Sequence, residues 1–142
     1  MGETRVDITL RNVSDETRFK YGLISDKDVR SIQVRALVDT GAVSIVINED
    51  ICQKLGLQIE GMRFARLVQP ATLAGGGKVN CKITEGIRIC WKDRDAICQA
   101  VVLPEGEPLL GVIPLEFMDL IVDPVAEQLV GAHGDRIVSR IM

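Results

Sequence analysis

The sequence predicts a single, mainly β domain, and three observations carry that prediction. The chain has 142 residues, which fits one domain of roughly 100–200 residues. Its composition is 46% hydrophobic and 26% charged, as in globular proteins that bury a core. Apolar and polar residues alternate along several short segments, and this period of two is typical of strands with one buried face.

The first half of the predicted order follows from that pattern. Alternation predicts strands at residues 6–10 and 32–38, and β-branched residues predict a third strand at 43–47. Asn48 is then a suitable N-cap for a short helix over residues 49–55. Strands therefore dominate, and a brief helix interrupts them.

The middle of the chain is predicted to form a hairpin over residues 79–91. A loop at residues 84–86 sets Ile83 opposite Ile87, and all the large apolar side chains then share one face. Burial of that face selects this register over a two-residue loop, which would mix the two faces. Gly86 would take the left-handed position that three-residue hairpin loops favour.

The last third of the chain is predicted to contain a turn, a helix and strands. The charged residues 92–95 form a turn that leads into a strand at 96–103. Pro114 is a suitable first residue for a second short helix, which runs to about residue 120. Two strands, at residues 128–132 and 136–141, close the chain.

Charge and cysteine content exclude several classes of function. A formal net charge of −3 gives no electrostatic footprint for nucleic acid or an anionic membrane. No apolar stretch approaches the roughly 20 residues that span a bilayer, and the charged N-terminus is unlike a signal peptide. A cytoplasmic location is therefore expected. The four cysteines lack C-x-x-C spacing, and His133, expected in a solvated turn, is the one histidine. We expect no metal site and no cofactor.

The most informative stretch is Asp39-Thr40-Gly41-Ala42, which lies between two apolar segments. A strand delivers the aspartate onto a tight turn, so the carboxylate projects from the end of a rigid element. Gly41 lets the backbone approach this carboxylate and offers its N–H as a donor. An Asp-Thr-Gly triplet arises by chance in such a chain at a level of roughly a few per cent. An ordinary turn is therefore the alternative.

The order of motifs resembles that of the retropepsin-like aspartic proteases of clan AA. Their first motif is a hydrophobic strand followed by the Asp-Thr-Gly turn described above. Their second motif is a hydrophobic pair and a glycine before a short helix, and here it is Leu109-Leu110-Gly111. Residues 110–124 are similar to the small, single-lobe prokaryotic members of the clan.

Between these motifs the family has a flap, a glycine-containing hairpin that covers the substrate. Ala74-Gly75-Gly76-Gly77 falls at the corresponding place and is the candidate substrate-binding flap. A flexible solvent loop is the alternative for these glycines. A phosphate-binding P-loop is excluded because Val79 stands where that motif requires Ser or Thr.

The resemblance implies a retropepsin-like closed β-barrel with two short helices. Residues 1–142 would form one domain, in which residues 1–31 are an N-terminal extension. It also implies an aspartic endopeptidase, in which one carboxylate accepts a proton from water and a second polarises the scissile carbonyl. Because the chain has one Asp-Thr-Gly, the resemblance implies a homodimer with Asp39 from each subunit. Thr40 would hydrogen-bond across the dimer, and Gly41 would donate to the carboxylate.

Two alternatives stay open beside catalysis. One is a non-catalytic, dimeric peptide-binding module with the same fold, and the other is a structural β domain unrelated to proteases. The intact Asp39-Thr40-Gly41 favours catalysis, because binding alone does not require an aspartate there. The expected partners are a second copy and a peptide or protein substrate, without nucleic acid, membrane or cofactor.

Overall fold

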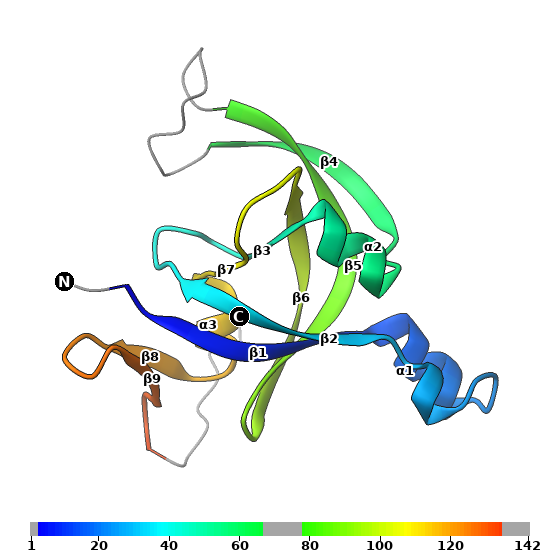
Figure 1. The fold of residues 1–142 in the computed structure, drawn as a ribbon, viewed down its shortest axis with the longest axis horizontal. Coiled ribbons are helices and arrows are strands. Elements are labelled where there is room, and N and C mark those ends of the chain that lie inside the picture. Colours follow the sequence, from blue (N-terminus) through cyan, green and yellow to red (C-terminus); the bar gives the residue numbers. More distant parts are fainter. Residues whose placement is uncertain (1–2, 67–77, 135–142) are drawn as a thin grey trace.

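The computed structural model describes residues 3–66 and 78–134, and strands make up most of this part (Figure 1). The strands are β1 (Arg5–Asn12), β2 (Ser31–Val38), β3 (Ile45–Asn48), β4 (Ile59–Arg66), β5 (Lys78–Trp91), β6 (Arg94–Leu103), β7 (Leu109–Leu110), β8 (Leu120–Asp123) and β9 (Gln128–Gly131). The helices are α1 (Val13–Lys20), α2 (Glu49–Leu55), α3 (Val112–Phe117) and a short 3-10 helix, η1 (Asp26–Asp28).

Six of the strands close a barrel. They follow one another in the order β1, β2, β7, β3, β6 and β5, and β5 pairs back to β1. β4 extends the sheet beyond β5, while β8 and β9 pair with each other in a separate two-stranded sheet. The expected mainly β fold with a closed barrel is confirmed, but the described residues hold three α-helices instead of two.

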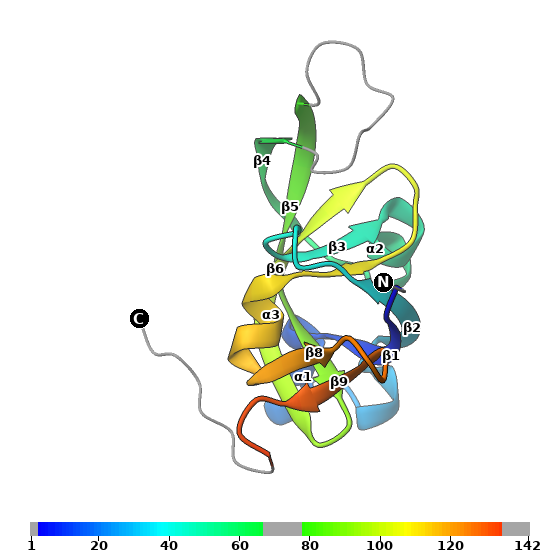
Figure 2. The same cartoon turned by 90° about the vertical axis from the view of Figure 1, so that its left-hand side faces the viewer.

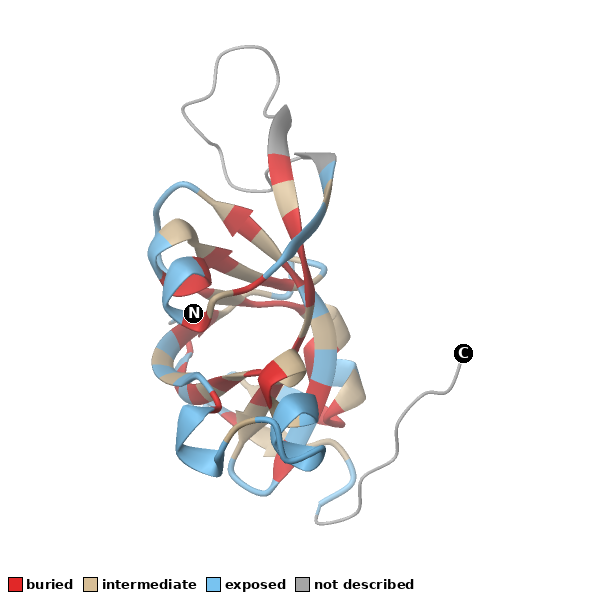
Figure 3. Cartoon of the chain, turned by 90° about the vertical axis from the view of Figure 1, so that its right-hand side faces the viewer, coloured by how far each residue is buried: buried red, intermediate tan, exposed pale blue. Residues whose placement is uncertain are grey.

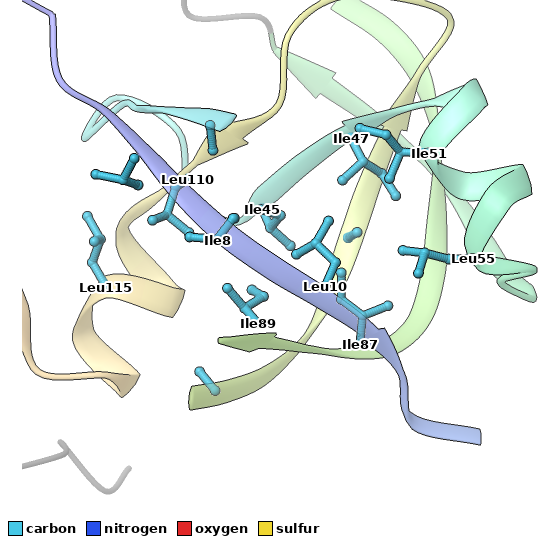
Figure 4. Close-up of a cluster of buried hydrophobic side chains, with 14 of the residues drawn as sticks. Ile8, Leu10, Ile45, Ile47, Ile51, Leu55, Ile87, Ile89, Leu110 and Leu115 are labelled. Atoms are coloured by element: carbon cyan, nitrogen blue, oxygen red, sulfur yellow. The ribbon is translucent and has the colours of Figure 1, made fainter. Parts of the chain in front are cut away.

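The barrel is filled by aliphatic side chains from alternate strand positions. In β1 the even-numbered residues are buried, so the period-two pattern of residues 6–10 marks the core face. Figure 4 shows side chains from distant segments meeting in this core, and Figure 3 shows buried and exposed residues alternating along the strands. Those labelled in Figure 4 are Ile8, Leu10, Ile45, Ile47, Ile51, Leu55, Ile87, Ile89, Leu110 and Leu115.

The connection between β1 and β2 contains the unexpected helix α1, followed by η1. Asn12 caps α1, and its side chain accepts a hydrogen bond from the backbone N–H of Asp15 at 2.9 Å. Asp15 is buried and binds Arg30 at 2.8 Å and Arg18 at 2.7 Å. The first turn of α1 thus carries a carboxylate, and its last turn carries basic residues, which complements the helix dipole.

The predicted hairpin over residues 79–91 is wrong, because β5 is one strand of 14 residues. The expected loop is a bulge between Ile83 and Gly86, and the chain reverses later, with Trp91 paired to Arg94. The two halves of β5 have different neighbours, since the first pairs with β4 and the second with β1. Burial of one face therefore came from two partners and not from a self-paired hairpin.

The second predicted helix is shifted towards the N-terminus. α3 spans Val112–Phe117, so Pro114 is its third residue, and residue 120 already belongs to β8. The helix starts earlier because Val112 and Ile113 donate their N–H groups to an adjacent loop. The predicted strand at 128–132 corresponds to β9, and the one at 136–141 lies outside the described residues.

Candidate active site at the Asp39 turn

Three strands position the Asp39 turn. β7 lies between β2 and β3: it runs parallel to β2, with Val38 beside Leu110, and antiparallel to β3, with Ile45 beside Leu110. The turn from β2 into β3 must therefore pass over the end of β7. The N–H of Asp39 donates to the carbonyl of Leu110 at 3.0 Å, which continues the β2–β7 ladder by one residue.

Within the turn, backbone donors hold the aspartate. The N–H of Gly41 donates to Oδ1 of Asp39 at 2.9 Å, and the N–H of Ala42 donates to its carbonyl oxygen at 3.0 Å. Asp39 is partly buried, whereas Thr40 and Gly41 are exposed. The carboxylate is thus fixed in orientation by its own turn and stays at the surface of the barrel.

The second motif supports this turn from below through a close backbone approach. The N–H of Val112 donates to the carbonyl of Ala42 at 2.9 Å, and that of Ile113 donates to the carbonyl of Val43 at 2.8 Å. A Cβ atom on Gly111 would lie 2.3 Å from the carbonyl oxygen of Ser44 and 2.6 Å from that of Ala42. Position 111 therefore requires glycine, because backbone atoms occupy the space of any side chain.

Side-chain charges near the turn are few. Arg5 makes two hydrogen bonds to the carboxylate of Glu107, at 2.9 and 3.0 Å, and this hydrogen bonding lowers the pKa of Glu107. Both side chains are more than a third exposed. Among residues 3–66 and 78–134, no basic side chain pairs with Asp39. Its carboxylate can therefore act as a proton acceptor towards a molecule at the surface.

The candidate flap cannot be placed. Ala74, Gly75, Gly76 and Gly77 lie outside the described residues, within the segment that joins β4 to β5. These two strands are antiparallel and pair up to Arg66 and Lys78. The flap stays a prediction from the sequence.

Sequence reasoning missed the residues that hold the turn through their backbones. Val112 and Ile113 supply two N–H donors, and the carbonyl of Pro108 accepts from Leu37 at 2.9 Å. Their side chains carry no signal for this role. Their position directly around Leu109-Leu110-Gly111 is the clue that could have identified them.

The other polar clusters offer no catalytic group for this turn. His133 is exposed but not only solvated, since its Nδ1 lies 2.8 Å from Oδ2 of Asp119. The four cysteines form no disulfide, and burial raises the pKa of Cys98 to about 11, so its thiol is no ready nucleophile. In the described part, no histidine, cysteine, aspartate or glutamate side chains group to hold a metal ion. No helix there is long and apolar enough to cross a membrane.

Comparisons with known proteins give one distant structural likeness. No known protein family and no curated protein sequence matches the chain. Among solved structures, the chain is similar to EIAV protease complexed with the inhibitor HBY-793. The two are 17% identical, the match covers 78% of this chain and 82% of that one, and the TM-score is 0.45. These values are too low to assign an activity to this chain.

Proposed function

We propose that this protein is an aspartic endopeptidase that acts as a homodimer, with Asp39 of each subunit in one active site. The observation that carries the proposal is the construction of the Asp39 turn. A partly buried carboxylate accepts the N–H of Gly41, and the backbone on both sides of it is bonded to the second motif at Leu110 and Val112. An ordinary surface turn needs neither that support nor a glycine at position 111.

In the proposed reaction, the two Asp39 side chains share the work. The ionised carboxylate takes a proton from water, and the water oxygen bonds to the scissile carbonyl carbon. The protonated Asp39 of the other subunit gives its proton to the carbonyl oxygen. The tetrahedral intermediate then breaks its C–N bond as the nitrogen receives a proton, which releases an acid and an amine.

The remaining residues of the motif have positioning roles. Gly41 keeps its donor on Oδ1, so the carboxylate presents the same edge to water in every turnover. Thr40 is exposed, and its hydroxyl is available to bond across the subunit interface, as the family resemblance implies. We propose the segment that holds Ala74, Gly75, Gly76 and Gly77 as the flap over the bound peptide. No metal or cofactor enters this scheme.

Substitution of Asp39 by Asn tests the proposal. The amide cannot accept the proton from water, so cleavage of a peptide library, followed by mass spectrometry between pH 4 and 7, should fall about a thousandfold or more. The matched control is Asp7→Asn, because Asp7 is an exposed β1 residue paired with Arg35 and should leave cleavage unchanged.

Two results would separate the alternatives. If the wild type binds peptides but cleaves none, the chain is a peptide-binding module. If Asp39→Asn cleaves at the wild-type rate, Asp39 is not the catalytic residue. Specific activity of the wild type should also fall on dilution below the dimer dissociation constant, and a fully active monomer in sedimentation would contradict the shared site.

A further inference from the structure

The β8–β9 hairpin stands apart from the barrel in its hydrogen bonding. β8 and β9 pair only with each other in the described part of the chain. A two-stranded hairpin is marginally stable unless another surface packs against it. Its base is anchored, because Arg94 is buried and donates to the carbonyls of Met118 and Asp119 at 2.9 and 2.8 Å. The hairpin is therefore a fixed projection and not a loose flap of chain.

This hairpin is apolar on both of its faces. Leu120 and Leu129 belong to the barrel core and are 4% and 3% exposed. Ile121 pairs with Val130 on the opposite face, and Ile121 is 51% exposed. Val125, at the tip, is 93% exposed. The solvent face of a half-buried antiparallel sheet is normally polar, so this face is unusual for a surface that stays in water.

The tip of the hairpin is held in its outward conformation. The carboxylate of Asp123 accepts the N–H groups of Val125 at 3.0 Å and Ala126 at 3.2 Å. The polar groups of the turn thus satisfy one another, and the apolar side chain of Val125 is left outside. Nothing in this bonding requires Val125 itself, because a polar residue would make the same backbone bonds.

The hairpin lies on the same side of the molecule as the Asp39 turn. In Figure 1 the end of β2, the helix α3 and both hairpin strands lie to the left, whereas α1 lies to the right. Figure 2 shows this left-hand side, with the loop between β2 and β3 above α3 and the hairpin below it. Any partner that completes the Asp39 site must therefore approach the side that carries the hairpin.

We propose that the outward face of the β8–β9 hairpin, with Ile121, Val125 and Val130, is a surface on which a second copy of this chain docks. The inference rests on the proposed function, which is incomplete without a second Asp39. In a two-fold dimer each patch near the axis meets its own copy, so the patch must be self-complementary. Uncharged aliphatic side chains meet this condition, because they bring no like charges together.

Ile121→Asp is the decisive variant, since it puts a charge opposite its own symmetry mate. Sedimentation velocity over a concentration series should show the dimer dissociation constant rising about 100-fold or more. Peptide cleavage should fall in parallel at low protein concentration and recover at high concentration. Ile97→Asp is the matched control, because Ile97 is 44% exposed in the wall strand β6 and should leave association unchanged.

Val125→Asp provides a second variant that puts no demand on strand packing, since position 125 is in the turn. It should also weaken the dimer, while the circular dichroism spectrum and melting temperature stay those of the wild type. An unchanged dissociation constant in both folded variants would overturn the proposal. So would a lower melting temperature of Ile121→Asp with unchanged association, because the face would then be covered within the same chain.

The experiment separates this inference from the proposed function. If the wild type dimerises through Ile121 but cleaves no peptide, the docking surface stands and the catalytic proposal fails. If both hairpin variants keep the wild-type dimer and its cleavage, the catalytic proposal stands and the docking surface fails. A wild type that stays monomeric at all concentrations overturns the docking surface.

Discussion

The two ends of the barrel are built by different chemistry. At the Asp39 end, backbone groups of Leu110, Val112 and Ile113 hold the turn, and a glycine lets the chains approach. At the other end, side-chain charges hold the inserted helix α1 (Figure 1). A site built from backbone tolerates many side chains but no added Cβ, whereas one built from ion pairs depends on particular side chains and on pH.

The centre of the insertion is the carboxylate of Asp15. It accepts Nε of Arg30 at 2.8 Å, Nη2 at 3.0 Å and the backbone N–H of Arg30 at 3.0 Å. Arg18 adds a bond at 2.7 Å. Asn12 links the same region to α2, because its side chain donates to the carbonyl of Leu55 at 2.7 Å. One carboxylate thus joins both sides of the inserted segment.

The largest expected effect comes from breaking the backbone contact at the Asp39 end. Gly111→Ala would force a methyl group against the carbonyl oxygens of Ser44 and Ala42, and neither can move without shifting the turn. We expect a loss of about 3 kcal/mol or more in the free energy of unfolding, measured with urea. Cleavage should fall as well, because the Asp39 turn moves.

Gly61→Ala is the control for that substitution. Nothing lies within 4 Å of a Cβ built at Gly61, so the alanine should leave the free energy of unfolding nearly unchanged. If Gly111→Ala is as stable as Gly61→Ala, the turn is not held by a close backbone approach, and the difference between the two ends disappears.

Loss of the central carboxylate should have the next largest effect. Hydrogen bonding to Arg30 lowers the pKa of Asp15 from 3.8 to about 2. Asp15→Asn removes that stabilisation, and we expect about 1–2 kcal/mol less free energy of unfolding near pH 7, since the half-exposed arginines are screened by water. Asp50→Asn, in an exposed pair with Lys54, should change it much less.

The pH dependence of the Asp15 effect has a definite sign. Because the pKa is lower in the folded protein, the carboxylate stabilises the fold above pH about 4. The contribution is lost as pH falls from about 4 towards 2. The difference between wild type and Asp15→Asn should therefore shrink over this range in urea titrations. A constant difference from pH 7 to pH 2 would show that the ion pairs contribute nothing.

The smallest effect is expected where an exposed ion pair lies at the Asp39 end. Arg5→Gln removes the pair with Glu107, and we expect a change in melting temperature within experimental error. Arg30→Gln is the same substitution at the other end and should lower it by about 3 °C or more. Equal effects in a thermal melt would mean that the two ends do not differ in their dependence on side-chain charge.

The sequence predicted those parts of the fold whose signals are local. The strand at residues 6–10 has the alternation of a one-sided strand, and α2 has both of its ends marked. Asn48 accepts the N–H of Ile51 at 2.9 Å, and Gly56 has a φ of 63°. In each case the residues that decide the structure are neighbours in the chain.

The parts that failed depend on distant residues. α1 is a polar helix without an apolar stripe, and its support comes from Arg30, which no pattern within Val13–Lys20 reveals. The 79–91 hairpin failed because β5 finds partners in both β4 and β1. At the candidate site, Asp39 and Leu109-Leu110-Gly111 were found as separate motifs. Their backbone contact needs the register of β7, which one sequence does not contain.

The position of β7 between β2 and β3 has a consequence for how the protein is made. Asp39 leaves the ribosome early, but the backbone that supports its turn arrives only with Leu110 and Val112. Closing a long loop is entropically costly, and contacts between distant residues form late in folding. The nascent chain therefore carries an unassembled Asp39 turn for most of its synthesis. Any activity of this carboxylate begins only after the C-terminal third of the chain has folded onto it.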